Sequence, residues 1–176
     1  MIRRTSLSVA RLPRFGERLE LRTWAAGVAA STASRRTTIG GDGGAAVEAE
    51  GVWVHIDPES RRPTRFPPDF LEAYAESASG PRPSTRLTLP ASPPDGAVDH
   101  EWRFAAADVD LAGHVNNAVY WHLLEELLPG ARADGAELLA EYRGGTGAGG
   151  ARVAADGTTV WVMDPGGETA ATLRRG

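Results

Sequence analysis

The stretch DVDLAGHVNN, residues 108–117, concentrates polar side chains of the kinds that act on carbonyl groups. It contains carboxylates, an imidazole and carboxamides: Asp108, Asp110, His114, Asn116 and Asn117. A carboxylate can take a proton from water as a general base, or attack a carbonyl carbon as a nucleophile. We therefore predict Asp110, His114 and Asn116 as catalytic residues, with Asp108 and Asn117 in support.

An apolar-striped segment follows directly and predicts a buried helix over residues 114–128. Its apolar residues recur at helical spacing: Val115, Val119, Leu123 and Leu127, with Tyr120, Leu124 and Leu128 one step behind. The first turn of a helix carries N–H groups without partners and a partial positive charge. We therefore predict that the backbone N–H groups of Gly113, His114 and Val115 stabilise an oxyanion. Glu126 lies on the polar side of this helix, where a solvated helix face is one interpretation.

A structural interpretation of the same residues stays open. An Asp ahead of a helix is usually a cap, and Asn at a helix start usually fixes a backbone turn. Gly113, in contrast, has no side chain to obstruct the approach of a ligand. The combination D-x-D-x-x-G-H-V-N-N joined to a buried helix is far more particular than an isolated D-x-D, and it favours a site.

Alternating segments indicate strands on both sides of this helix. Residues 5–56 predict an antiparallel meander with a hairpin turn at the glycine-rich residues 40–44. Residues 58–97 are rich in Pro, Ser and Arg and indicate a connector, with a short helix over residues 69–77 capped by Asp69. Further strands are predicted at residues 100–104, 136–143, 151–155, 158–164 and 168–174. One helix followed by such strands fits a curved sheet around a central helix.

Composition narrows the class of protein. A chain of 176 residues with 41% hydrophobic content can form an ordinary core, and with no cysteine it has no thiolate chemistry. The formal net charge of -4 argues against nucleic acid as a partner. Residues 1–65 nevertheless hold 11 of the 19 basic residues and only 7 of the 23 acidic ones. A solvated strand face accounts for this surplus, and recruitment of an acidic partner is the alternative.

Location and metal content are predicted from the same sequence. No apolar run is long enough to span a membrane and no signal peptide is recognisable, so we expect a cytoplasmic protein without membrane contact. His55, His100 and His122 lack the spacing of a metal site, so no metal is predicted.

The segment DVDLAGHVNNAVYWHLLEE, residues 108–126, resembles the helix-entry motif of hot-dog-fold acyl-acyl carrier protein thioesterases of the plant and bacterial type. Landmarks similar to that family's occur earlier, at Trp24, Arg35-Arg36 and the segment 53–57. The resemblance implies an α+β double hot-dog fold, in which a curved antiparallel sheet wraps a central helix. It divides the chain into a partial first repeat (1–57), a connector (58–97) and a second repeat (98–176). It also implies no cofactor and an acyl thioester of acyl carrier protein as substrate. Glu126 aligns with an acidic residue usual in the family's helix, so the resemblance implies a supporting role for it.

Three features depart from the family pattern. Ala112 stands where the plant-type motif has Asn, so a polar group is missing. The family's later catalytic Glu follows a strand that ends in Tyr-Arg, whereas Tyr142-Arg143 lead here into Gly144, Gly145 and Thr146. The first repeat also lacks its N-terminal strand and long helix. We therefore expect the chain to be N-terminally truncated, with a coding segment upstream of Met1.

The expected function is hydrolysis of acyl-acyl carrier protein, which releases free fatty acid in fatty acid biosynthesis. Two alternatives remain. One is a non-catalytic hot-dog protein that binds acyl chains or partners, which Ala112 and the missing Glu favour; the other is an acyl-CoA thioesterase. The apolar sheet face left without a helix in the first repeat suggests association, for which a homodimer is a possible form.

Overall fold

The computed structural model describes residues 1–74 and 76–176. The chain divides into two compact units, Met1–Leu87 and Thr88–Gly176. This division falls inside the segment 58–97 that the composition predicts as a connector, so each unit contains part of that segment. Among the described residues, neither α-helix is long and apolar enough to cross a membrane.

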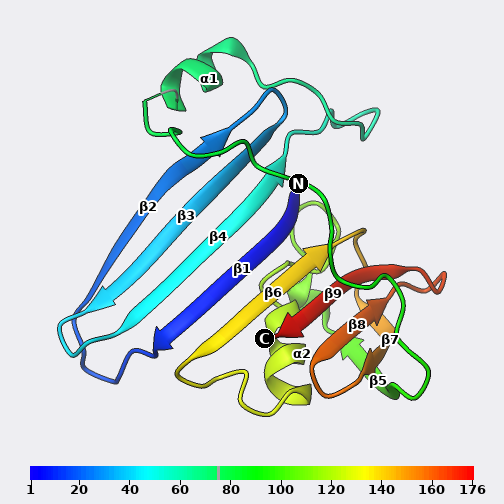
Figure 1. Ribbon diagram of the computed structural model, residues 1–176. Helices are drawn as coiled ribbons and strands as arrows, with labels where there is room; N and C mark the ends of the chain where they lie inside the picture. Colours follow the sequence, from blue (N-terminus) through cyan, green and yellow to red (C-terminus); the bar gives the residue numbers. More distant parts are fainter. Residues whose placement is uncertain (75) are drawn as a thin grey trace. The chain divides into compact units, whose positions relative to one another are not determined.

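The described part of unit 1 forms an antiparallel sheet in the order β2-β3-β4-β1 (Figure 1). Its strands are the ones that sequence alternation predicts, and they are β1 (Ile2–Arg11), β2 (Leu19–Val28), β3 (Thr32–Gly41) and β4 (Ala46–Val54). Only β2, β3 and β4 follow one another as a meander. β1 pairs with β4 rather than β2, which corrects the predicted meander. The link between β1 and β2 spans residues 12–18, longer than a tight hairpin turn, so the two strands are free to separate.

Neighbouring rows of the unit 1 sheet differ in polarity. Leu21, Ile39, Val47 and Val9 lie opposite one another across the four strands and form an apolar row. The next row places Arg22, Thr38, Glu48 and Ser8 on the other face, because neighbouring residues of a strand point to opposite sides.

The short helix α1 (Pro68–Tyr74) packs beside β2 in unit 1. It confirms the predicted helix but begins one residue early, so Asp69 lies in its first turn and is not the residue ahead of the helix. The predicted helix extends to residue 77 and includes Ala75, which lies outside the described residues.

Unit 2 forms an antiparallel sheet in the order β6-β9-β8-β7-β5, with a helix, α2, that lies behind it in the view of Figure 1. The chain enters through β5 (Val98–Phe104) and the short 3-10 helix η1 (Ala106–Asp108). The remaining elements are α2 (Tyr120–Leu127), β6 (Ala136–Tyr142), β7 (Gly149–Ala155), β8 (Thr159–Met163) and β9 (Thr169–Arg175). These strands confirm the predicted ones.

Helix α2 packs against β8 and β9. Tyr120, Leu123, Leu124 and Leu128 are at most 1% exposed, so the predicted apolar stripe does face the sheet. The helix begins at Tyr120, however, and not at residue 114 as its periodicity predicts. The residues before it are held in turns by bonds between side chains and backbone, which compete with helical hydrogen bonds.

A buried carboxylate anchors the start of unit 2. Glu141 on β6 is fully buried, and its oxygens accept hydrogen bonds from Thr88 N–H (2.7 Å), Thr88 Oγ1 (3.0 Å) and Leu89 N–H (2.9 Å). Arg143 lies 3.6 Å from this carboxylate and also donates to the carbonyl oxygen of Leu89. The segment that leads toward β5 is therefore fixed to the sheet by charged hydrogen bonds, which are stronger than neutral ones.

Candidate active site

Residues 108–116 form a narrow loop that turns back on itself between β5 and α2. The N–H of Asp110 donates to the carbonyl oxygen of His114 over 2.8 Å, and the N–H of Asn116 donates to that of Asp108 over 2.8 Å. Gly113 stands at the turn with φ +79°, a conformation that side chains disfavour. A Cβ at this position would meet open space, so the glycine is required by the turn and leaves the adjacent backbone accessible.

The two aspartates of this loop have different surroundings. Asp108 is half-buried, and its Oδ2 accepts the N–H of Ala105 over 2.7 Å, which closes the turn of η1. Asp110 is exposed; its Oδ1 accepts the N–H of Ala112 over 2.8 Å. Within the part of the chain that the structure describes, no ion pair involves Asp110. Asp110 is therefore the carboxylate that a ligand can reach.

The two asparagines hold the chain ahead of α2. Oδ1 of Asn116 accepts the N–H of Ala118 over 2.9 Å, and its carbonyl oxygen accepts the N–H of Val119 over 2.9 Å. The carbonyl oxygen of Asn117 accepts the hydroxyl of Tyr142 over 3.3 Å. Asn116 thus caps a turn through its side chain, as the structural interpretation of the sequence allows.

The predicted oxyanion donors are arranged differently from the sequence expectation. Because α2 starts at Tyr120, the N–H groups of Gly113, His114 and Val115 do not lie in its first turn. The N–H of Gly113 donates to the carbonyl oxygen of Asp110 over 3.0 Å, and that of Val115 donates to the carbonyl oxygen of Thr146 over 2.7 Å. Among the described residues, no hydrogen bond involves the N–H of His114, so it alone of the three can receive an oxyanion directly.

His114 lies against the loop that follows β6. Its half-buried ring packs on the backbone of Gly145, where a Cβ would stand 2.5 Å from Cδ2 of the imidazole. The structure therefore brings the D-x-D-x-x-G-H-V-N-N loop together with residues 144–146, the segment where the resembling family has its later carboxylate. Sequence reasoning noted that segment only for its missing Glu, and local pattern gave no sign that it contacts His114.

Tyr120 is a buried aromatic residue at the start of α2, just after the motif loop. Its ring packs edge-on against Phe104 and Tyr142, with centroids 5.6 and 5.9 Å away. Burial raises the pKa of Tyr120 to about 12, although the backbone of Thr146 lies near enough to oppose that rise. The hydroxyl makes no hydrogen bond of ordinary geometry to any residue that the structure describes. The phenol stays protonated at neutral pH and is excluded as a general base.

Glu126 and Ala112 contribute little to the loop. Glu126 is exposed on α2, and no hydrogen bond or ion pair within the described ranges involves its side chain. Ala112 is exposed beside Asp110 and takes part through its N–H alone. The site is thus built from one reachable carboxylate, one imidazole and one backbone N–H.

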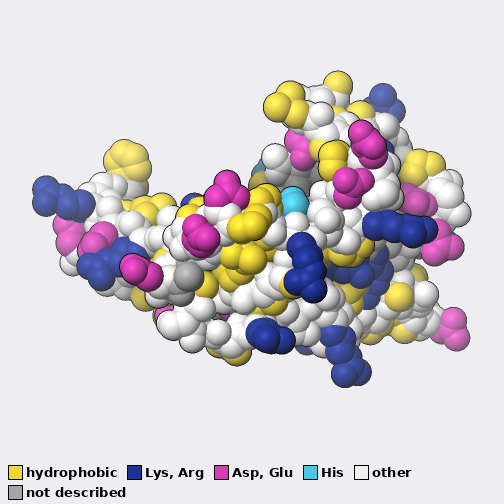
Figure 2. All heavy atoms as spheres, turned by 90° about the horizontal axis from the view of Figure 1, so that it is seen from above, with side chains coloured by type: hydrophobic (Ala, Val, Ile, Leu, Met, Phe, Trp, Pro, Cys, Tyr) yellow, Lys and Arg dark blue, Asp and Glu magenta, His cyan; other side chains and the backbone are white. Residues whose placement is uncertain are grey.

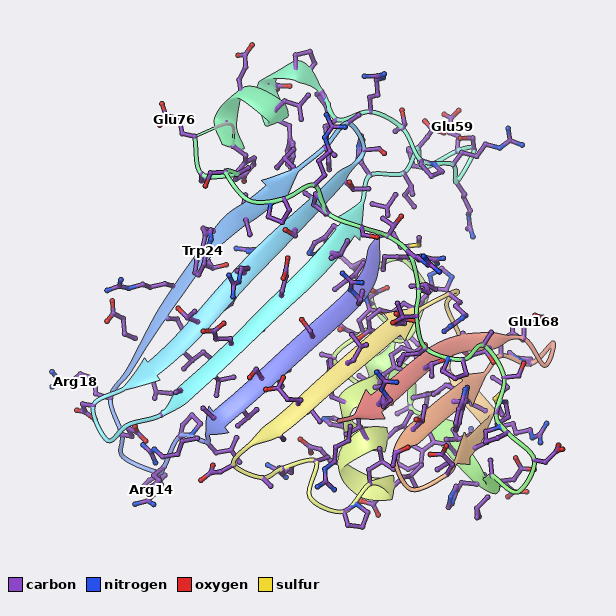
Figure 3. The ribbon with its side chains drawn as sticks, viewed as in Figure 1. Arg14, Arg18, Trp24, Glu59, Glu76 and Glu168 are labelled. Atoms are coloured by element: carbon purple, nitrogen blue, oxygen red, sulfur yellow. The ribbon has the colours of Figure 1, made fainter. Side chains whose placement is uncertain are left out.

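Unit 1 contains an apolar cleft of about 510 Å³ at one end of its sheet. One wall is a ladder of rings, His55, Phe66, Phe70 and Tyr74, with successive centroids 5.0, 4.2 and 4.8 Å apart. The first three rings are stacked, and Tyr74 is tilted by 50° against Phe70. Figure 2 shows hydrophobic side chains gathered over the α1 region. The opposite wall comes from the sheet and includes Trp24, which Figure 3 labels on β2.

Family models match both units. The N-terminal domain of acyl-ACP thioesterases matches residues 1–74, and the C-terminal domain of the same enzymes matches residues 92–139. The chain belongs to the acyl-ACP thioesterase family. Curated relatives of this family member include an uncharacterized protein of Mycobacterium tuberculosis, 28% identical over 105 residues. That match covers 60% of this chain but only 42% of the relative, so the chain spans less than half of the relative's length.

Solved structures agree on the fold of this thioesterase family member. An acyl-ACP thioesterase from Bacteroides thetaiotaomicron matches 99% of this chain and 74% of its own, with a TM-score of 0.76 and 18% identity. The 12:0-ACP thioesterase from Umbellularia californica matches 99% of this chain and 73% of its own, with a TM-score of 0.77 and 19% identity. A hot-dog-fold protein from Alicyclobacillus acidocaldarius matches 99% of this chain and 76% of its own, with a TM-score of 0.53 and 11% identity. The fold is therefore α+β and hot-dog-like.

Proposed function

We propose that this protein hydrolyses the thioester of an acyl chain carried by acyl carrier protein or CoA. The observation that carries the proposal is the reachable carboxylate of Asp110, four residues before His114 in the loop that lies on Gly145 and Thr146. Family membership supports the same activity, because acyl-ACP thioesterases are hydrolases of this kind. The two units correspond in this proposal to two hot-dog repeats, with a cytoplasmic location.

The proposed reaction uses groups of this one loop. The second oxygen of the Asp110 carboxylate takes a proton from water, while the water oxygen bonds to the thioester carbon. The carbonyl oxygen becomes an oxyanion, which accepts the backbone N–H of His114, while the imidazole of the same residue assists. The tetrahedral species then expels the thiolate, which takes the proton back from Asp110. Free acid and free thiol are the products. Asp108, Asn116 and Asn117 keep the loop in this shape.

The aromatic cleft of unit 1 is proposed to bind an apolar ligand. The volume of about 510 Å³ lies within the range of ordinary ligand pockets. The ladder of His55, Phe66, Phe70 and Tyr74 offers a hydrophobic wall, which suits an alkyl chain because burial of each methylene is favourable by about 0.8 kcal/mol.

The activity test measures free thiol released from acyl-acyl carrier protein and from acyl-CoA with a thiol-trapping reagent. We expect Asp110→Ala to lower turnover by a factor on the order of 10²–10⁴, because the general base is lost. Asp95→Ala is the matched control, since Asp95 is an exposed aspartate in the turn before β5. Unchanged turnover in Asp110→Ala would refute the assignment, and competition between the two substrates identifies the carrier.

A non-catalytic acyl-binding protein is the second candidate. It is favoured by the use of the Gly113 and Val115 N–H groups inside the chain and by the apolar side chain of Ala112. The discriminating experiment measures binding of the same acyl thioesters beside their hydrolysis, over several chain lengths. Binding without release of thiol from any of them selects this second function.

A further inference from the structure

The loop after β6 contains several glycines, and they differ in what surrounds them. A Cβ on Gly145 would lie 2.5 Å from Cδ2, 2.6 Å from Cγ and 3.1 Å from Cβ of His114. Cβ atoms in proteins do not approach other atoms closer than about 3 Å, because the contact is then strongly repulsive. A Cβ on Gly144 or Gly147, in contrast, would meet nothing within 4 Å.

Backbone conformation does not explain the glycine at 145. The glycines with positive φ in the described chain include Gly113 and Gly149, but neither Gly144 nor Gly145. The backbone at position 145 thus lacks the positive φ that favours glycine, and the three nearest atoms that a Cβ would meet there all belong to His114.

The backbone on both sides of this contact is pinned. Val115 N–H donates to Thr146 over 2.7 Å, and the carbonyl oxygen of His114 accepts the N–H of Asp110 over 2.8 Å. The side chain of Thr146 is buried, with 3% exposure. A side chain added at position 145 therefore cannot push the two segments apart cheaply, and the imidazole must rotate away instead.

We infer that Gly145 is a positioning residue of the proposed active site, where its bare backbone sets the orientation of the His114 imidazole. This inference rests on the proposed hydrolase function. It also explains how this chain differs from the family pattern noted above. The later carboxylate of that pattern falls among Gly144, Gly145 and Thr146, and at Gly145 a side chain and this orientation of His114 exclude each other.

The test compares Gly145→Ala with Gly144→Ala, which adds the same methyl group one residue earlier into open space. We expect Gly145→Ala to lower kcat about 10- to 100-fold with little change in KM, since a misplaced catalytic group costs rate rather than affinity. Gly144→Ala should keep kcat within about twofold of wild type. Equal activity of both variants would overturn the inference.

A double-mutant cycle separates positioning from general disruption. In a His114→Ala background the two ring contacts of 2.5 and 2.6 Å are gone and only the 3.1 Å contact with the Cβ remains, so Gly145→Ala should cause a much smaller further loss of activity and thermal stability than in wild type. An equal additional loss in both backgrounds would show that Gly145 acts independently of His114 and would contradict the inference. The stability arm of the cycle gives this answer even if Gly145→Ala alone folds poorly.

A spectroscopic readout keeps this inference distinguishable from the proposed function. The ring proton resonances of His114, assigned by their loss in His114→Ala, should shift in Gly145→Ala and remain in place in Gly144→Ala. If wild type hydrolyses no thioester but this pattern is observed, the proposed function fails while the positioning by Gly145 stands. If the His114 resonances stay unchanged in Gly145→Ala, the positioning itself is wrong.

Discussion

The backbone N–H of Val115 donates to the carbonyl oxygen of Thr146 over 2.7 Å. This one bond joins the D-x-D-x-x-G-H-V-N-N loop to the loop after β6, two segments far apart in sequence. Because of this bond, the N–H of Val115 is not available to a ligand. The N–H of His114, one residue earlier, has no acceptor among the described residues and remains available.

Amide hydrogen exchange should report this difference directly. We expect the N–H groups of Val115 and Asn116 to exchange at least about tenfold more slowly than those of His114 and Asn117, because only the first two donate to another residue of the described ranges. NMR of the uniformly labelled protein after transfer to deuterated water measures the four rates. The N–H of Glu141, which lies inside β6 opposite Thr172 of β9, serves as a protected reference. Slow exchange at His114 would mean that its N–H has a partner and cannot serve an oxyanion.

The side chain of Asn116 is expected to act on the backbone. Its Oδ1 accepts the N–H of Ala118 at 2.9 Å, so Asn116→Ala should lower the free energy of unfolding by about 1 kcal/mol, the usual cost of losing such a cap. Asn116→Asp retains the acceptor oxygen and should keep most of that stability. Urea unfolding followed by circular dichroism measures both.

Asn117 supplies the comparison for this pair of variants. No hydrogen bond of its carboxamide occurs among the residues that the structure describes, so Asn117→Ala should change stability by less than about 0.5 kcal/mol. If Asn116→Ala abolished thioester hydrolysis without any loss of stability, Asn116 would contact the substrate, as the sequence prediction had it.

The strands could be predicted from the sequence because each carries its own signal. The alternation of Leu19 and Leu21 with charged residues follows the two-residue period of a strand, and β2 is where that period predicts it. Pairing order carries no such local signal. The position of β1 beside β4 depends on contacts between two strands, such as Val9 opposite Val47. The sequence of either strand alone does not reveal its partner.

The start of α2 shows where periodicity misleads. Val115 and Val119 continue the apolar stripe backward from Leu123, yet the chain is not helical there. Val115 is buried all the same, because it pairs with Val109 across the motif loop. An apolar residue at helical spacing can thus be buried by a turn, and Asn116 supplies the hydrogen bonds that favour the turn. The contact between His114 and Gly145 could not be predicted from the sequence either. It joins two segments that are far apart in the chain and come together only in the folded sheet.

Glu141 is expected to be a large contributor to the stability of unit 2. It is fully buried, and its oxygens accept from Thr88 and Leu89. In Glu141→Gln the amide NH2 would face N–H donors and Arg143 would lose its charge partner. We expect a loss of about 3 kcal/mol in the free energy of unfolding, measured in urea.

The control for Glu141 is another strand glutamate. Glu101 on β5 is exposed, and Glu101→Gln should change the free energy of unfolding by less than about 0.5 kcal/mol. A similarly small effect of Glu141→Gln would show that the carboxylate does not fix residues 88–89 in solution.

Glu17 should make the stability of unit 1 depend on acid pH. The N–H groups of Arg14 and Ala45, together with the guanidinium of Arg11 2.6 Å away, lower the pKa of Glu17 from 4.5 to about 2. A carboxylate whose pKa is lower in the folded state favours folding when ionised, so its contribution is complete above pH 4.5 and is lost as the pH falls toward 2.

We expect Glu17→Gln to be less stable than wild type at about pH 6.5, and the two proteins to converge near pH 2. Glu20→Gln is the control, because the pair of Glu20 with Arg22 is exposed to water and contributes little. Urea unfolding at a series of pH values gives the difference, and a gap between wild type and Glu17→Gln that stayed constant down to about pH 2 would contradict the assigned pKa.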